Sequence, residues 1–148
     1  MFVLKNHQRA APLIQEMWEH EKAHLAKFEE LLVEYKVSPT ILIPLWKLAG
    51  FTLGAGCALL GESGAMACTV AVEASITEHY NDQIRRLTNT HNEEHRELIE
   101  TITKFRDEEQ EHHDIGLDHD AELAPAYQAL SGVIKVGCKT AIWLSERV

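Results

Sequence analysis

Two short segments of this sequence place a glutamate three residues before a histidine. One segment contains Glu21 and His24, and the other contains Glu109 and His112. Residues i and i+3 lie on one face of a helix, so each pair can direct a carboxylate and an imidazole at the same metal ion. This mixture of ligands suits iron. Two such pairs on separate helices predict a shared centre of the kind that carboxylate-rich helical bundles build around two metal ions.

A third carboxylate stands out because its neighbours are apolar. Glu73 follows the run Val70-Ala71-Val72, where an unpaired buried carboxylate would cost free energy. We therefore predict that Glu73 is a metal ligand, with an exposed helical position as the alternative. Tyr80 lies seven residues later and shares the face of Glu73. Its phenol either packs in the core or serves the metal centre through a hydrogen bond or electron relay.

A different interpretation rests on the first segment alone. The sequence from His20 to His24 matches the pattern His-Glu-x-x-His, in which zinc metalloproteases use two histidines as ligands and the glutamate as a general base. This pentapeptide is not very specific. It also leaves Glu73, Glu109 and His112 without a role, so we prefer the shared two-metal centre.

The elements that must position these residues are helices. Strong helix formers dominate and strict alternation of apolar and polar residues is missing. Prolines, glycines and the turn ending at Asn92, a suitable N-cap, divide the chain into five segments. We expect helices at about residues 12–35, 40–60, 64–87, from 93 to beyond 112, and from 125 to the C-terminus. The length predicts one all-α domain covering residues 1–148.

The ligand spacing suggests a repeated helical hairpin. Glu73 and Glu109 are 36 residues apart, and the same spacing would place a partner of Glu21 before residue 1. A two-metal bundle uses one glutamate from each of two helices and a Glu-x-x-His pair from each of the other two. We therefore expect a four-helix bundle whose first helix is largely missing, so that the chain is truncated at its N-terminus.

Two apolar segments, residues 40–60 and 125–144, need a separate explanation. The first is nearly long enough to span a bilayer, but Lys47 interrupts it. It is either a helix buried on all sides or a helix with one face on a membrane surface. We predict peripheral attachment to a membrane through the apolar faces of both segments.

Charge and cysteine content exclude other classes of function. There are 14 lysines and arginines against 23 acidic residues, a net charge of −9. This balance argues against nucleic-acid binding, which relies on a basic surface. Cys57, Cys68 and Cys138 are an odd number without CxxC spacing. We expect reduced thiols and no disulfide framework.

Together these segments resemble the demethoxyubiquinone hydroxylase family of ubiquinone biosynthesis, in an animal mitochondrial form. The most specific matches are residues 64–73, 111–125 and 144–147. The resemblance implies a ferritin-like bundle with two iron ions, bound peripherally to the matrix side of the mitochondrial inner membrane and its lipids. It implies hydroxylation of the ring of demethoxyubiquinone, a polyprenyl quinone lipid, with O₂ and electrons from NADH. A lipid-binding accessory protein of the pathway is the family's partner, and a homo-oligomer stays open.

The resemblance also assigns individual residues. Glu21 and His24 match the family's second ligand helix, Glu73 the third, and Glu109 with His112 the fourth. His79 and Tyr80 match a pair placed near the irons, which makes them the candidate catalytic residues. Gly116, one turn beyond His112, is expected to leave room for a ring. The departure is the missing first glutamate, so the alternative is a catalytically impaired, truncated isoform that acts as a lipid-binding or scaffold protein.

Overall fold

The computed structural model describes residues 10–90 and 93–148, and over this part all of the regular secondary structure is helical. The α-helices are α1 (Ala10–Glu34), α2 (Ile43–Ala58), α3 (Glu62–Asn89), α4 (Arg96–Asp118) and α5 (Tyr127–Ser145). Two short 3₁₀ turns, η1 (Glu93–His95) and η2 (Ala121–Leu123), lie at the two ends of α4. The expected all-α, ferritin-like fold is confirmed. The expected N-cap Asn92 lies outside the described residues.

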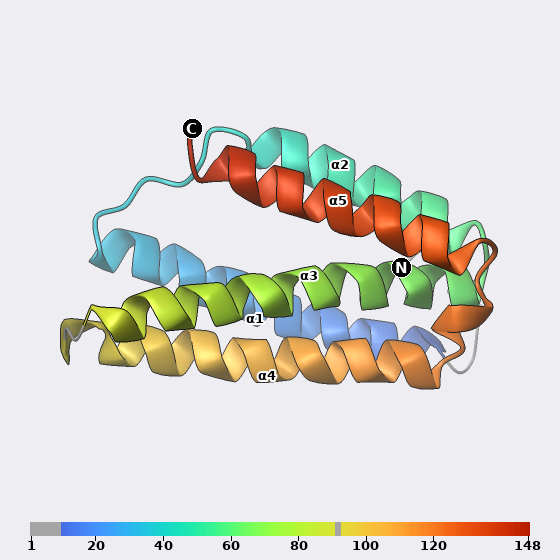
Figure 1. Cartoon of the computed structure of the whole chain (residues 1–148), viewed down its shortest axis with the longest axis horizontal. Helices are drawn as coiled ribbons and strands as arrows, with labels where there is room; N and C mark the ends of the chain where they lie inside the picture. Colours follow the sequence, from blue (N-terminus) through green and yellow to red (C-terminus); the bar gives the residue numbers. More distant parts are fainter. Residues whose placement is uncertain (1–9, 91–92) are drawn as a thin grey trace.

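The helices form two layers that meet at α3 (Figure 1). In one layer α1, α3 and α4 run side by side, and in the other α2 and α5 lie over α3. The ion pair between Lys139 on α5 and Glu78 on α3, at 2.9 Å, ties the layers together. The Trp46 indole also donates to Ser145 Oγ at 2.8 Å and joins α2 to α5. Helix α3 is therefore the shared wall between the layers.

The helix boundaries follow local backbone chemistry. Helix α2 begins with Pro44 in its first turn. A backbone N–H at this position has no acceptor within the helix, so proline, which lacks that N–H, costs no hydrogen bond there. Helix α3 begins two residues earlier than expected, directly after Gly61, whose φ of +90° suits glycine and breaks the preceding helix. Helix α5 begins later than expected, at Tyr127, because Ala126 is left-handed with φ of +52°.

Helices α3 and α4 pack tightly against each other at Gly116. A Cβ atom there would lie 2.7 Å from Val70 Cγ2 and 3.3 Å from the Met66 carbonyl oxygen. The expectation that this glycine leaves room for a ring is therefore wrong, since α3 fills the space. Met66 and Val70 pack there with Ala67 and with Ala121 of η2 in one buried cluster. This contact fixes the spacing of α3 and α4 next to the predicted ligands.

The outer face of the α2 and α5 layer is unusually apolar. On α2, Phe51 is 71% exposed and Leu48 62%, Val133 of α5 is 73% exposed, and Ile41 in the turn before α2 is 79% exposed. Of the two explanations for residues 40–60, burial on all sides is therefore wrong. Within residues 10–90 and 93–148, none of the helices has the length and apolar character needed to cross a membrane.

Candidate metal centre

Three helices direct acidic and imidazole side chains to one point inside the first layer. Four residues each offer a ligand atom, and these atoms all lie within 4.8 Å of one another. They are Glu21 from α1, Glu73 from α3, and Glu109 and His112 from α4. Glu109 and His112 are each only 2% exposed. One turn of α4 thus supplies two of the four groups, as the spacing of three residues predicts.

His24 completes the set of five predicted ligands. Its Nδ1 lies 3.2 Å from Glu109 Oε1 and 3.9 Å from Glu21 Oε2. The Nδ1 of His112 lies 3.2 Å from Glu109 Oε2 and 3.5 Å from Glu21 Oε1. Both imidazoles therefore present Nδ1 to the same two carboxylates, and the structure brings together all five residues that the sequence singles out.

Several atoms of this cluster are buried but unpaired. His24 Nδ1, His112 Nδ1 and Glu109 Oε2 have no hydrogen-bond partner in the described part of the chain. Their short separations lack hydrogen-bond alignment. An unsatisfied buried polar atom costs about 1–3 kcal/mol. A cation among them would satisfy all three at once, so the donor set fits a metal with carboxylate and imidazole ligands.

The charges of the cluster perturb one another strongly. Burial, followed by the charges of Glu109 and Glu21, raises the pKa of Glu73 well above its ordinary value. Burial opposes ionisation of Glu109, but the adjacent imidazoles of His112 and His24 outweigh it and lower the pKa of Glu109 to about 2. Burial likewise opposes protonation of His112, yet Glu109 and Glu21 raise its pKa to about 10. Without a metal, the His112 imidazole is therefore held protonated against the carboxylates.

Both imidazoles are held from behind by a second side chain. The Nε2 of His24 lies 2.7 Å from Glu108 Oε2, and the Nε2 of His112 lies 3.1 Å from His20 Nδ1. The rings of His20 and His112 also stack, with centroids 5.3 Å apart. Such partners orient a metal-binding histidine and set its tautomer. His20 thus faces the far nitrogen of His112 on α4 and does not form with His24 the pair of histidine ligands that the zinc-protease interpretation requires.

A comparison with known protein families identifies the family of the chain. Residues 1–145 match the family described as ubiquinone biosynthesis protein COQ7. The chain belongs to this family. The predicted resemblance is thereby confirmed.

Curated relatives in the COQ7 family extend the comparison. The chain is 64% identical over 137 residues to a human protein named NADPH-dependent 3-demethoxyubiquinone 3-hydroxylase, mitochondrial, covering 93% of this chain and 63% of that protein. It is 51% identical over 136 residues to a Rhodospirillum rubrum protein named 3-demethoxyubiquinol 3-hydroxylase, covering 92% and 62%. It is 40% identical over 148 residues to 5-demethoxyubiquinone hydroxylase, mitochondrial, of Saccharomyces cerevisiae, covering 93% and 64%. The chain thus spans less than two thirds of the length of these COQ7 relatives.

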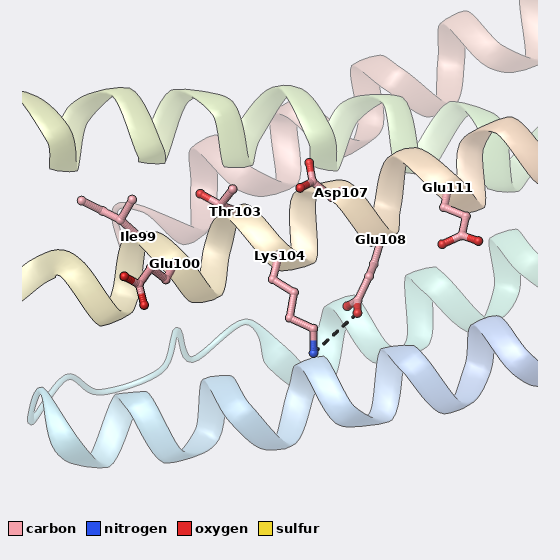
Figure 2. A pocket seen from close by; sticks show the side chains of 7 residues that line it. All are labelled: Ile99, Glu100, Thr103, Lys104, Asp107, Glu108 and Glu111. Atoms are coloured by element: carbon pink, nitrogen blue, oxygen red, sulfur yellow. Dashed lines mark ion pairs between the residues drawn. The ribbon is translucent and has the colours of Figure 1, made fainter.

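Glu108 is a site residue that sequence reasoning missed. Figure 2 shows it on α4 next to Lys104, and the two form an ion pair of 3.6 Å. These residues line a surface groove of about 530 Å³ along α4. Glu108 precedes the predicted ligand Glu109 and has no i+3 histidine, so the ligand spacing did not mark it. Only the pairing of α1 with α4 shows that it reaches His24.

The two candidate catalytic residues have different surroundings. Tyr80 is buried, and burial followed by the charges of Glu109, Glu21 and Glu73 raises the pKa of its phenol well above the ordinary value. His79 instead lies between α3 and α5 with Arg86 and Glu146, and burial is the largest cause of its lowered pKa. Tyr80 therefore packs in one cluster with Phe105, whose ring contacts His24, whereas His79 lies in a separate pocket. The catalytic role of both residues stays a prediction.

Proposed function

We propose that this chain supplies the metal-binding bundle of a demethoxyubiquinone hydroxylase, a monooxygenase of ubiquinone biosynthesis. Two iron ions would be held by Glu21, His24, Glu73, Glu109 and His112. The observation that supports this most is the convergence of these groups, with buried Nδ1 atoms left unpaired at their centre. Membership of the COQ7 family and the names of the relatives support the choice of reaction.

The residues of the chain have distinct tasks in this proposal. When bound, iron supplies the redox chemistry that activates O₂. Glu108 and His20 keep each imidazole turned with Nδ1 toward the centre. Phe105 packs on His24, with ring centroids 4.0 Å apart, and helps to exclude water from that side. The protonated Tyr80 phenol can donate a hydrogen bond toward the cluster.

The substrate and the electron donor also belong to the proposal. The ring of demethoxyubiquinone accepts the new hydroxyl group from O₂, and a reduced nicotinamide nucleotide provides the electrons. The family resemblance implies NADH, whereas the human relative is named NADPH-dependent. An assay of the chain should therefore compare the two nucleotides directly.

A peripheral membrane location fits the nature of this substrate. A polyprenyl quinone stays in the apolar phase of a membrane. The exposed apolar side chains of α2 and α5 form a surface through which the protein can contact that membrane. The names of the human and yeast relatives include the word mitochondrial. We propose attachment to the matrix side of the mitochondrial inner membrane. The same surface is our candidate for contact with the lipid-binding accessory protein.

A non-catalytic scaffold is the second candidate function. The side chain of Glu21 is 45% exposed, so the cluster is open to solvent on that side in the described part of the chain. The apolar face of α2 and α5 requires no metal. A chain that binds lipid but holds no complete metal pair would serve the same pathway without turnover.

Metal analysis combined with a product assay separates the two candidates. The purified chain is loaded anaerobically with Fe²⁺, and iron is counted per chain. It is then incubated with O₂, a short-chain demethoxyubiquinone and either NADH or NADPH, and the ring product is measured by mass spectrometry. Two irons per chain with hydroxylated product support the enzyme. Lipid binding without iron retention or product supports the scaffold and contradicts the enzyme for this chain.

A further inference from the structure

A second cavity lies at the end of the bundle where α1 and α3 end and α4 begins. Its volume is about 480 Å³, within the range of small-molecule sites. Apolar side chains from three helices make up most of its lining, together with the polar side chains of Gln83, Tyr35 and Arg86. The main contributors are Phe28 and Leu31 of α1, Gln83 and Leu87 of α3, and Leu98 and Ile102 of α4. None of the five candidate metal ligands lines this cavity.

Gln83 is the polar group that this lining leaves unsatisfied. Its Oε1 is buried and has no hydrogen-bond partner among residues 10–90 and 93–148. The neighbouring Tyr35 hydroxyl is already committed, since it donates to the Glu94 carbonyl at 3.2 Å. A ligand that brings an O–H group into the cavity would satisfy this amide oxygen. An apolar ligand without a donor would leave it unpaired.

The inner wall of the cavity favours an aromatic ring. Phe28 lies edge-on to Phe105, with centroids 5.4 Å apart, and its ring is 6.2 Å from that of Tyr80. Phe28 and Ile102 also belong to the packed cluster around Tyr80. A planar ring could extend this aromatic stack outward into the cavity. One layer of side chains would then separate it from Tyr80.

We propose that this cavity binds a small aromatic ring bearing a hydroxyl group, of the phenol or hydroquinone class. The hydroxyl donates to Gln83 Oε1, and the ring packs against Phe28 and between Leu98 and Leu31. The site is distinct from the metal centre and does not depend on the proposed hydroxylase function. A quinol, which has hydroxyl donors, satisfies Gln83, whereas the corresponding quinone has only acceptors.

The test uses two probes of similar size on the whole metal-free chain. Phenol and toluene are titrated separately, and methyl resonances of Leu31, Leu98 and Ile102 are followed by NMR. Both probes should shift these methyl groups in a saturable way, while Leu144 methyl groups stay unchanged. The variant Gln83→Leu should weaken phenol binding about five-fold, as expected for one hydrogen bond, and leave toluene binding equal or tighter.

The matched control is Gln128→Leu, an exposed glutamine on α5, which should change neither affinity. Absence of saturable shifts for both probes in the unmodified chain would overturn the proposed site. Equal weakening of phenol and toluene in Gln83→Leu would overturn the hydrogen bond to Gln83. Because no metal or turnover is involved, either result is independent of the iron and product assays.

Discussion

Two regions of the molecule reverse the usual distribution of charged and apolar residues. They are the centre of the layer formed by α1, α3 and α4, and the outer face of the layer formed by α2 and α5. In the centre, Glu109 and His112 are almost fully buried, whereas on the outer face Ile41 and Phe51 are more than two-thirds exposed. Folded proteins normally expose charge and bury large apolar groups. Each region therefore suits an external partner, and we propose a cation for the centre and an apolar surface for the face.

Helix α3 lets the two regions coexist in a small domain. It presents Glu73 to the centre, while Ala71 and Cys68 pack toward Cys57 of α2 and Ile134 of α5. All three cysteines are free, as expected from their number. Burial and the neighbouring Cys57 raise the pKa of the Cys68 thiol to about 12. This interface therefore behaves as ordinary apolar packing, and the unusual features lie on either side of it.

The largest effect is expected from removing the central carboxylate. Glu109→Ala leaves His24 and His112 buried without the carboxylate that lies 3.2 Å from both. Breaking a buried charge pair from one side costs about 3–5 kcal/mol. We expect the metal-free variant to lose stability on this scale in urea denaturation, and to retain no iron on metal analysis.

The control for this variant lies on the same helix. Glu111 is exposed and two residues further along α4. Glu111→Ala should change the free energy of unfolding by no more than about 0.5 kcal/mol and keep the iron content. Equal iron retention by Glu109→Ala and Glu111→Ala would show that the buried centre is not a metal site.

A smaller effect is expected behind the centre. Glu108→Ala removes the carboxylate that holds His24 Nε2 at 2.7 Å while leaving all five candidate ligands in place. Loss of such an orienting partner typically weakens metal binding about 10–100-fold. Titration with Co²⁺, followed by its visible absorption, measures this change. Lys104→Ala breaks only the ion pair on the other Glu108 oxygen and should leave the affinity nearly unchanged.

The sequence alone predicts more about the centre than about the outer face. Four of the five candidate ligands were predictable because a spacing of three residues on a helix fixes a common face, and Glu73 because its neighbours are apolar. Glu108 and His20 were not assigned this way because their partners lie on another helix. The role of Gly116 was predicted wrongly, since a glycine near a ligand is equally consistent with a substrate pocket and with close helix packing. The face of residues 40–60 was left open because an all-apolar helix carries no periodic signal.

Gly116 tests how tightly the centre depends on the packing beside it. Overpacking costs about 1–3 kcal/mol, while replacing helical glycine by alanine gains about 1 kcal/mol. In Gly116→Ala the new Cβ would lie 2.7 Å from Val70 Cγ2. We therefore expect the variant to be destabilised by about 1 kcal/mol net. Gly132→Ala on α5 meets no atom within 4 Å and should be stabilising instead. Thermal unfolding of both variants gives the signs, and a stabilised Gly116→Ala would refute the close contact of α3 and α4.

The smallest effect on stability, and the sharpest test of the outer face, is expected from Phe51→Glu. Phe51 is 71% exposed, so its ring gains little from the fold and the change should alter the free energy of unfolding by at most about 0.5 kcal/mol. Binding to cardiolipin-containing liposomes should nevertheless fall strongly in flotation assays, because a charge replaces apolar area at the proposed membrane surface. Val33→Glu on α1, also an exposed apolar residue changed to glutamate, should float like the unmodified chain. If Phe51→Glu were as destabilising as Glu109→Ala, the face would be part of a packed core. If it floated normally, the apolar face would have to serve a protein partner, and the membrane proposal would fail.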